Sequence, residues 1–304
     1  MRKVILGLVC CVMIFASATG AYAGKCSTKY PVILVHGALF SSNNYLGINY
    51  WWRIPKSLTN EGTEVYQTHQ RPVGSSENMA KDISKELGEL FALHPEWTKV
   101  NIIAHSQGPL AARYFISNLS IPGKGPAKNY VASLTSISGT HRGSKIADLL
   151  LGLDNALPSL GIVIEDLVNW YGKLFYYNTQ DANSHDALVG LTSDYMLNIF
   201  NPNTPDADGV YYQSWGGKIT SFNPLDSMSY TWQIIKLMGG GDNDGMVTLD
   251  CAKWGKWRGA MTSAWWSYGV SHLEEVDQLF GVTPGFDAPA FYVNAVAELK
   301  NMGF

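Results

Sequence analysis

The chain has 304 residues, of which 46% are hydrophobic and 15% are charged, and its formal net charge is −3 at pH 7. A chain of this length can bury a sizeable core, and α/β domains often reach this size without splitting. The mildly acidic balance lacks the basic surface that nucleic-acid binding requires. We find no internal repeat, low-complexity tract or linker, so we expect one domain.

The N-terminus has the three parts of a secretory signal peptide. An arginine and a lysine follow the first methionine, residues 4–15 are apolar, and residues 21–23 form an A-x-A cleavage site. The apolar run is shorter than the roughly 20 residues that cross a bilayer core, which makes an uncleaved anchor the weaker alternative. We expect residues 1–23 to be removed and residues 24–304 to be secreted through the periplasm as one domain.

A continuous apolar run at residues 30–35 marks the first expected strand of a buried sheet. Val and Ile are frequent in it, as in parallel strands that are covered on both faces. Further strands are expected at residues 100–104, 131–138 and 210–215, and a second short strand at about 64–68.

Two helical patterns lie between these runs. Ser76 is the expected cap of a helix whose apolar residues recur every four positions from 79 to 91. Pro109 suits the first turn of a second helix that runs to about Asn118. Strands that alternate with helices predict an α/β fold, with a mostly parallel central sheet and helices on both faces.

The alternation changes between about residues 146 and 200. Residues 162–175 are apolar around most of a helix, and their polar positions fall on one narrow side. Such a helix must bury its broad face against another part of the protein. Two interpretations stay open for it: an ordinary buried helix, or a mobile lid over an apolar pocket.

The strongest chemical signal is Ala104-His105-Ser106-Gln107-Gly108, between a predicted strand and a predicted helix. It matches the nucleophile elbow G-x-S-x-G, with Ala in place of the first Gly. The residues two before and two after the serine must be small because strand and helix approach closely there. The spacing predicts Ser106 as a nucleophile. It also aims the Gln107 backbone N–H and the helix N-terminus at a developing oxyanion.

A serine hydroxyl is a weak nucleophile until a base takes its proton. Where this elbow occurs, the partners follow in the chain order serine, acid, histidine. Of the seven histidines, only His141, His185 and His272 follow Ser106, and only His272 follows the late strand region where an acid is expected. His272 is therefore the predicted base.

The acid is expected in the glycine-rich loop at residues 239–247. This loop carries two carboxylates, Asp242 and Asp244, and can bring one of them to the imidazole without a helix in the way. Asp244 precedes a glycine and is the predicted acid, with Asp242 as its local rival. Its role would be to hold the imidazole tautomer and to stabilise the imidazolium.

A second oxyanion donor is expected in the loop after the first strand. This loop carries His36-Gly37-Ala38-Leu39, and the Ala38 backbone N–H is the predicted donor. Gly37 lets the backbone approach the substrate. His36 is expected to pin the loop rather than to act as an acid or base.

Together these motifs resemble the secreted Pseudomonas- and Burkholderia-type true lipases, within the α/β-hydrolase superfamily. The resemblance covers the chain from about residue 30 to the C-terminus. It is carried by YPVILVHG at 30–37, LGINYWWRIPKSL at 46–58, VNIIAHSQG at 100–108, TSISGTHRGSKIADLL at 135–150, YYQSWGG at 211–217, DNDGMV at 242–247 and SHLEEVDQLFGV at 271–282.

The resemblance implies a serine ester hydrolase that works through an acyl-enzyme. It places Ser106, Asp244 and His272 on the family's triad, and Ala38 and Gln107 on its oxyanion-hole positions. It also implies a lid within the changed segment and an insoluble ester substrate, typically triacylglycerol. A dedicated lipase foldase is a further partner that it suggests.

The resemblance also implies a structural calcium ion that braces the histidine loop. In the family the ion takes two carboxylates and two backbone carbonyls, an all-oxygen set that suits calcium. The matching positions are Asp226, Glu274, Gln278 and Val282. Glu274 stands where the family has Asp, and the alignment near Asp226 requires a gap.

Two points stay open in the sequence. A carboxylesterase or phospholipase on the same framework is the alternative function, and a catalytically silent binding protein is less expected because all three triad residue types are retained. Cys26 and Cys251, the two cysteines outside the signal segment, could form a disulfide or remain free thiols. The disulfide found in many members of the family cannot form here, because this sequence has no cysteine shortly before the YYQSWGG motif.

Overall fold

The structure, a computed structural model, describes residues 24–38, 49–152, 184–278 and 281–304. The predicted signal segment and the predicted apolar helix at 162–175 lie outside these residues. Of the segment expected to contain a lid, residues 146–152 and 184–200 are described. Within the described chain, no helix is both long and apolar enough to cross a membrane.

A six-stranded sheet forms the centre of the molecule, in the order β2-β1-β3-β6-β7-β8. All five neighbouring pairs are parallel, which confirms the predicted α/β fold with its parallel sheet. The strands are β1 Val32–Val35, β2 Val65–Gln67, β3 Val100–His105, β6 Val131–Ile137, β7 Tyr211–Gly216 and β8 Lys256–Ala260. A small antiparallel pair, β4 Ser120–Ile121 and β5 Gly125–Pro126, stands apart.

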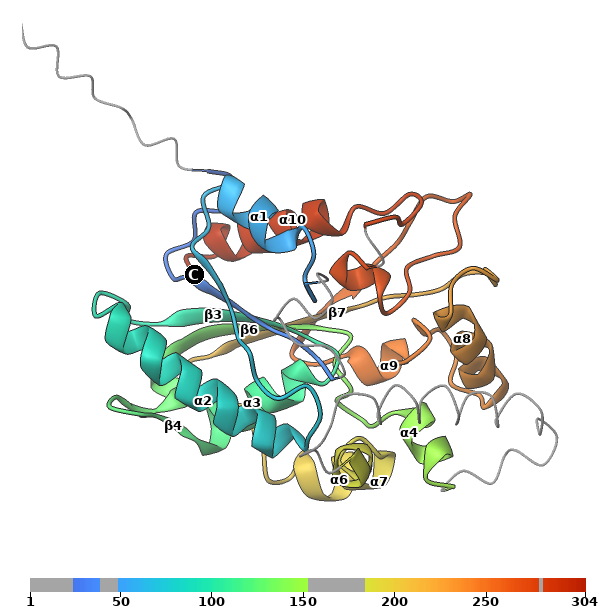
Figure 1. Cartoon of the computed structure of the whole chain (residues 1–304), viewed down its shortest axis with the longest axis horizontal. Helices are drawn as coiled ribbons and strands as arrows, with labels where there is room; N and C mark the ends of the chain where they lie inside the picture. The colour runs from blue at the N-terminus through green and yellow to red at the C-terminus, as the bar shows by residue number, and fades with distance from the viewer. Residues whose placement is uncertain (1–23, 39–48, 153–183, 279–280) are drawn as a thin grey trace, which may run out of the picture.

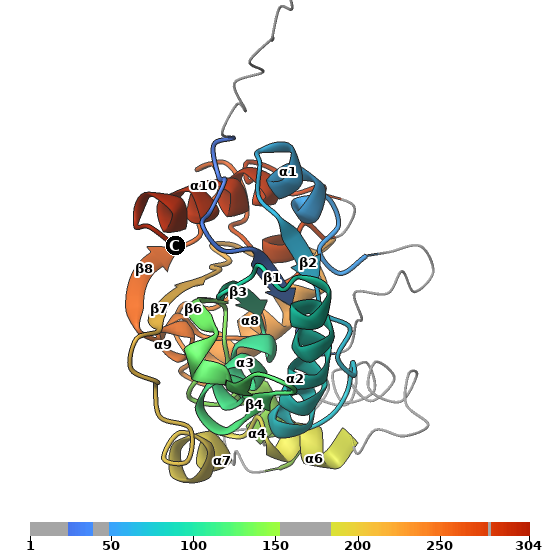
Figure 2. The same ribbon diagram turned by 90° about the vertical axis from the view of Figure 1, so that its left-hand side faces the viewer.

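Helices cover both faces of the sheet, with α1 and α10 on one face and α2 and α3 on the other (Figures 1 and 2). The α-helices are α1 Ile54–Asn60, α2 Ser76–Leu93, α3 Gly108–Asn118, α4 Lys145–Leu150, α6 Ser184–Val189, α7 Ser193–Tyr195, α8 Met228–Leu237, α9 Leu249–Ala252 and α10 Ala288–Asn301. Three short turns complete the set: η1 Ala127–Asn129, η2 Met196–Phe200, which is a π-helix, and η3 Glu274–Val276.

Side chains alternate between the two faces of the sheet along β1, which explains why a separate hydrophobic cluster lies on each face. Ile33 and Val35 pack with residues of α2 and α3 in one buried cluster. Val32 and Leu34 point to the opposite face and pack with residues of α1 and α10 in a second cluster. Because both faces are covered, the strand is apolar at every position, which is the pattern that predicted it.

One local prediction needs correction. The cap of α2 is Ser75, whose hydroxyl accepts a hydrogen bond from the Asn78 N–H, and Ser76 is the first helical residue. Ser76 instead faces Gln107, whose side-chain Nε2 lies 3.3 Å from its hydroxyl.

The cysteine question has a clear answer in the structure. Cys26 and Cys251 are both free and buried. The Cys26 thiol lies against the carbonyl oxygens of Leu58 and Glu61, whereas the Cys251 thiol lies 2.9 Å from the carbonyl oxygen of Gly143. The two sulfur atoms occupy separate environments and form no disulfide.

Candidate active site

The turn between β3 and α3 has the geometry of a nucleophile elbow. Ser106 has a φ of +63°, a backbone conformation that L-residues seldom adopt. A Cβ at Gly108 would come within 2.7 Å of the carbonyl oxygens of both Val35 and His36. Only glycine fits there without displacing β1, which is the physical reason for the small residue in the motif. The strained turn places Ser106 at the carboxyl end of the central strand.

Ser106, His272 and Asp244 form one hydrogen-bonded row. The Nε2 atom of His272 lies 2.9 Å from the Ser106 hydroxyl oxygen. Its Nδ1 atom lies 2.8 Å from Oδ2 of Asp244. The backbone N–H of His272 also donates to the Asp244 carbonyl oxygen at 2.9 Å, which fixes the two loops to each other. The structure thus brings together three predicted site residues that lie far apart in the chain.

Asp244 is fully buried, and its second oxygen is held by the backbone. Oδ1 accepts hydrogen bonds from the N–H groups of Met246 at 2.8 Å and Val247 at 2.7 Å. Burial alone would raise the pKa of this carboxyl, but His272 and the two N–H groups outweigh burial and leave the pKa below its usual value. Asp244 therefore stays ionised beside the imidazole.

The rival carboxylate, Asp242, lies elsewhere. Its side chain is about half exposed and forms an ion pair with Lys218, with Oδ2 and Nζ 2.6 Å apart. Two residues of the same loop thus point to different environments, one buried against His272 and one at the surface. The structure places Asp244, and not Asp242, beside the imidazole.

The two predicted oxyanion donors flank Ser106. Gln107 follows it directly at the N-terminus of α3, and its side chain donates to the Gly74 carbonyl oxygen at 3.0 Å. On the other side, Gly37 is packed so closely that a Cβ there would lie 2.5 Å from the Ser106 Cβ. Ala38 is the next residue along this loop. The loop after β1 therefore approaches the nucleophile closely at Gly37.

His36 holds that loop in place. Its ring nitrogens lie 2.7 Å from the Gly37 carbonyl oxygen and 3.1 Å from that of Gln70. Complete burial lowers the pKa of His36 to about 4, so the ring is neutral at physiological pH. The Gln70 side chain returns a hydrogen bond to the His36 carbonyl at 2.7 Å. These contacts agree with the structural role expected of His36.

A buried polar network beneath the histidine was not predicted from the sequence. The His105 ring lies 4.4 Å from the His272 ring, centroid to centroid. Its Nδ1 is 2.6 Å from the Tyr50 hydroxyl, and its Nε2 is 3.0 Å from Oε2 of Glu275. Ser138, at the end of β6, donates to Oε1 of Glu275 at 2.7 Å. Glu275 thus joins the histidine loop to the ends of β3 and β6.

The electrostatics of this network follow from its burial. Burial and the neighbouring Asp244 carboxylate raise the pKa of Glu275 well above its ordinary value. Burial and the neighbouring His272 lower the pKa of His105 well below its own. Both shifts favour the neutral forms, because unpaired charge is costly where water is absent. The one available sequence signal was the second glutamate of the HLEEV stretch, three residues after His272.

Removal of the Glu275 carboxyl group should destabilise the fold. Glu275→Ala leaves His105 Nε2 and the hydroxyl hydrogen of Ser138 without a buried partner, and we expect it to lower the free energy of unfolding by about 2–4 kcal/mol. Denaturant titration measures this change. Glu89→Ala, which alters an exposed position of α2, is the control and should have little effect. Equal stability of the two variants would show that the network contributes nothing.

The four positions implied for calcium lie around the histidine loop. Asp226 and Glu274 are close enough to interact: burial, with the charge of Asp226 beside it, raises the pKa of Glu274 to about 7. The Ser271 N–H donates to Oε2 of Glu274 at 2.8 Å, and the Met228 N–H donates to Oδ1 of Asp226 at 2.9 Å. The two carboxylates thus come from separate loops, and both lie next to the Ser271 side chain.

Gln278 and Val282 complete the implied set. The Gln278 side chain donates to the carbonyl oxygens of Asn49 and Tyr50, at 2.6 and 3.2 Å. Val282 has an exposed side chain, at 74%, so its carbonyl is the only group it could offer an ion. The hydroxyls of Ser271 and Thr283, which neighbour the carboxylates, are buried and make no hydrogen bond of normal geometry within the described chain.

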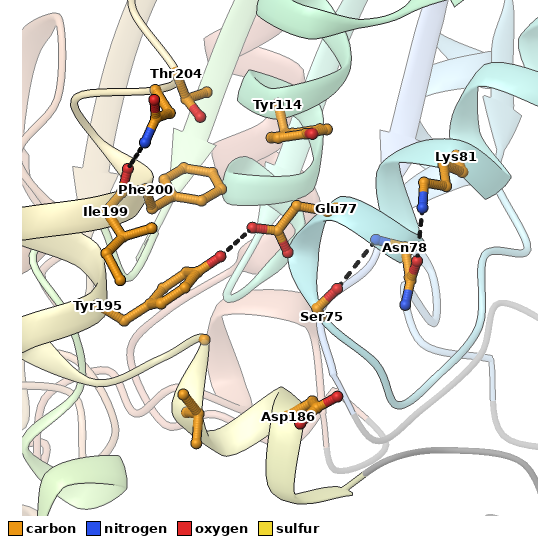
Figure 3. A pocket seen from close by; sticks show the side chains of 13 residues that line it. Ser75, Glu77, Asn78, Lys81, Tyr114, Asp186, Tyr195, Ile199, Phe200 and Thr204 are labelled. Carbon is orange, nitrogen blue, oxygen red and sulfur yellow. Dashed lines mark hydrogen bonds between the residues drawn. The ribbon is translucent and has the colours of Figure 1, made fainter.

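A cavity of about 560 Å³ lies away from this site, between the N-terminal part of α2 and the segment 186–204 (Figure 3). Tyr114, Tyr195 and Phe200 contribute aromatic walls. The Tyr195 hydroxyl donates to Oε1 of Glu77 at 2.5 Å, which ties α7 to α2. None of the three residues of the Ser106 row lines this cavity, so it is separate from the predicted reaction centre.

The parallel sheet, the serine elbow and the row of serine, histidine and aspartate define a serine hydrolase of the α/β-hydrolase fold. A triacylglycerol lipase of Vibrio cholerae is 30% identical over 313 residues, which cover 94% of this chain and 94% of that protein. A triacylglycerol lipase of Burkholderia plantarii is 29% identical over 88% of this chain and 83% of that protein. The chain belongs to the triacylglycerol lipase family, which confirms the predicted resemblance.

Solved structures share the fold. The mature form of the Bacillus licheniformis lipase BlEst2 superposes with a TM-score of 0.62 at 16% identity, over 90% of this chain and 93% of that one. A lipase of Staphylococcus hyicus superposes with a TM-score of 0.58 at 15% identity, over 91% of this chain and 98% of that one. No family model matches the chain. The protein is a lipase and thus a carboxylic ester hydrolase.

Proposed function

We propose that this protein is a secreted triacylglycerol lipase in which Ser106 forms the acyl-enzyme, His272 transfers the protons and Asp244 orients His272. The observation that carries the proposal is the hydrogen-bonded row of these three side chains at a strand–helix elbow. Membership of the triacylglycerol lipase family supports the substrate class.

The geometry supports a two-step acyl transfer. His272 Nε2 takes the proton of the Ser106 hydroxyl as the oxygen attacks the ester carbonyl. The backbone N–H groups of Gln107 and Ala38 stabilise the oxyanion, and the helix N-terminus of α3 adds a favourable field. His272 then gives its proton to the departing alcohol. Water, activated by the same histidine, releases the fatty acid and restores Ser106.

The surroundings of His272 suit this role. The ionised Asp244 stabilises the imidazolium that forms in each step and keeps the proton on Nδ1. The neutral His105 beneath the ring adds no positive charge to oppose it. The buried Glu275 anchors His105 rather than facing the substrate. These groups favour a histidine that can gain and lose its proton on Nε2.

The substrate class can be tested directly. Purified protein should hydrolyse emulsified triacylglycerols of long acyl chains as well as p-nitrophenyl esters. A carboxylesterase would instead act on short, soluble esters and leave the emulsion intact, and a phospholipase would prefer phospholipid vesicles. Absence of turnover on all three substrates would favour a silent binding protein and contradict the proposal.

Secretion is part of the proposal and rests on the pattern of residues 1–23. Mass spectrometry of the protein recovered from the culture medium should give a mature N-terminus at Gly24. A requirement for a lipase foldase would appear as inactive protein when the chain is expressed alone, with activity restored by co-expression of the partner. An intact N-terminus on cell-bound protein would contradict secretion.

We also propose a structural calcium ion held by the carboxylates of Asp226 and Glu274 and by the backbone carbonyls of Gln278 and Val282. The donor set fits, because the charge of Asp226 acts on Glu274 and all four donors are hard oxygens. A bound ion would relieve the repulsion between the carboxylates. Its contribution would be to brace the loop that carries His272, at a distance from the bond that is cleaved.

Calcium removal should therefore affect stability and activity together. Binding to the folded state alone stabilises it by about 2.7 kcal/mol at a free concentration 100 times the Kd, so chelation should lower the Tm by roughly 5 °C. Added calcium should restore both Tm and rate, and magnesium should substitute poorly. Differential scanning fluorimetry and ester hydrolysis provide the two readouts.

Asp226→Ala is the matching variant for this test. It should abolish the response to calcium while Ser106 still reacts with a serine-directed phosphonate. Asp242→Ala, a surface carboxylate of a neighbouring loop, is the control and should respond to calcium like the wild type. If chelators change neither Tm nor rate, and elemental analysis finds no metal, the calcium proposal is wrong.

A further inference from the structure

Three loops lie side by side next to the loop that carries His272. They comprise residues 219–225, 264–270 and 282–286. Ile219 and Gly269 form an antiparallel bridge, and the Thr220 N–H donates to the Tyr268 carbonyl oxygen at 2.7 Å. The Ser267 hydroxyl donates to the Pro284 carbonyl oxygen at 2.5 Å. These bonds fix the three loops as one surface.

This surface exposes large apolar side chains to an unusual degree. Two tryptophans are adjacent in the chain, with Trp265 95% and Trp266 60% exposed. Leu225 is 94% exposed. Phe222 and Tyr230 pack edge to face, with ring centroids 5.1 Å apart. We define the aromatic surface by six exposed residues: Phe222, Leu225, Tyr230, Trp265, Trp266 and Tyr268. Soluble proteins seldom gather such side chains unless the patch contacts a partner.

The three loops contain no Lys, Arg, Asp or Glu. The charged residues that directly flank these loops in the chain are already engaged: Lys218 pairs with Asp242, the Asp226 carboxylate accepts from the Met228 N–H, and the Asp287 carboxylate caps α10 by accepting from the Ala290 N–H. The whole chain is mildly acidic. A partner recognised by charge would therefore find little to bind here, and an anionic membrane would be repelled by the rest of the protein. The aromatic surface suits an uncharged partner.

The aromatic surface also lies at the reacting edge of the sheet. Residues 219–225 follow β7 and residues 264–270 follow β8, so both loops leave the carboxyl ends of strands, as Ser106 does after β3. Figure 1 shows α8 and the loop that leads into it beyond these strand ends. Tyr268 precedes His272 by four residues. Anything that binds here is held beside the predicted reaction centre.

We propose that the aromatic surface docks the protein onto an uncharged lipid–water interface, such as the surface of a triacylglycerol droplet. Trp and Tyr side chains suit this boundary because each has an apolar ring and a polar group that can stay in water. The inference rests on the proposed function, since the interface is the surface of the proposed substrate. The docking residues lie outside the segment 146–200 in which a lid is expected.

Binding without turnover tests the docking surface on its own. In a Ser106→Ala background, the protein should float with phosphatidylcholine vesicles that contain triolein. Trp265→Ala/Trp266→Ala should lower the partition coefficient by about tenfold or more, because each tryptophan brings 150–250 Å² of surface to the interface. Leu225→Ala should lower it several-fold. Leu93→Ala, which truncates a leucine that is 74% exposed at the far end of α2, is the matched control and should bind like the parent.

Salt and lipid charge provide a second arm of the experiment. Binding should survive high salt and should not strengthen when phosphatidylglycerol replaces phosphatidylcholine. Unchanged binding by the tryptophan double variant, or binding that requires anionic lipid and disappears in salt, would overturn the proposal. So would a parent protein that self-associates in gel filtration, with the double variant monomeric and equally bound to vesicles.

Hydrolysis separates this inference from the proposed function. With Ser106 restored, the tryptophan double variant should cleave soluble p-nitrophenyl butyrate at the wild-type rate and emulsified triolein more slowly. If the wild type cleaves the soluble ester but never triolein, the substrate assignment fails, whereas the vesicle measurements still decide whether the aromatic surface binds lipid.

Discussion

Replacing Ser106 with alanine is expected to lower ester hydrolysis by about three orders of magnitude or more while the protein stays folded. Without the hydroxyl oxygen, no acyl-enzyme forms, and His272 Nε2 loses the group it deprotonates. Only the oxyanion donors and substrate binding remain, and these support slow attack by water at best. Loss of the hydroxyl should cost little stability, because His272 keeps its bonds to Asp244.

Single-turnover kinetics with a p-nitrophenyl ester measure this loss, and circular dichroism checks the fold. A fluorescent phosphonate should label wild-type protein at Ser106 alone. Ser120→Ala, at an exposed position of β4, is the matched control and should keep full activity and full labelling. Wild-type activity in the Ser106 variant, or a label on another serine, would contradict the proposed nucleophile.

The predicted strands were recognisable because the sheet is covered on both faces. The continuous aliphatic run VILV predicted β1, and stretches that mix Val and Ile with small or polar residues predicted β3 and β6; all three strands are fully buried. The edge strand β8 has the sequence KWRGA and half-buried or exposed positions throughout. The pairing of β8 with β7 depends on the register of the two backbones and not on the amino-acid composition of β8. Its sequence therefore carries no periodic apolar signal from which a strand could be predicted.

The reacting side chains were predictable because the elbow motif and the chain order limit the choices. Ser106 could be predicted because the elbow motif requires small residues around the serine. His272 could be predicted because the other histidines do not satisfy the chain order. The supporting network could not be found in the same way. Tyr50 and Glu275 meet His105 across 55 and 170 residues of chain. Only the packing of β1, β3 and the histidine loop brings them together, and neither belongs to a local motif.

The sequence alone could not decide firmly between Asp242 and Asp244 as the acid. Both residues lie in one flexible glycine-rich loop, so the spacing allows either to reach an imidazole. Burial separates them: Asp244 is fully buried against His272, whereas Asp242 is half exposed beside Lys218. A bridge between Asn243 and Thr248 folds the loop back on itself. The partners that distinguish the two side chains, His272 and Lys218, come from more distant parts of the chain, and such tertiary contacts cannot be read from the loop's own sequence.

Asp244→Asn is the second change for which we expect a large effect, about four orders of magnitude in turnover. The geometry gives the reason. Met246 and Val247 both donate backbone N–H groups to Oδ1, so the asparagine oxygen must take that place. Its amide NH₂ then faces His272 Nδ1 and can only donate. Nδ1 must therefore become the acceptor, the proton moves to Nε2, and the imidazole can no longer take a proton from Ser106.

Asp242→Asn is the matched control, because it makes the same chemical change two residues away. It removes only the partly exposed ion pair with Lys218, which contributes at most about 1 kcal/mol of stability. Turnover should stay within a few-fold of the wild type. A ¹H NMR spectrum should show the downfield Nδ1 proton of His272 in wild type and in Asp242→Asn, and its loss in Asp244→Asn. If Asp242→Asn instead abolished turnover and Asp244→Asn did not, the acid of the triad would be Asp242, and the buried contact with His272 would be structural only.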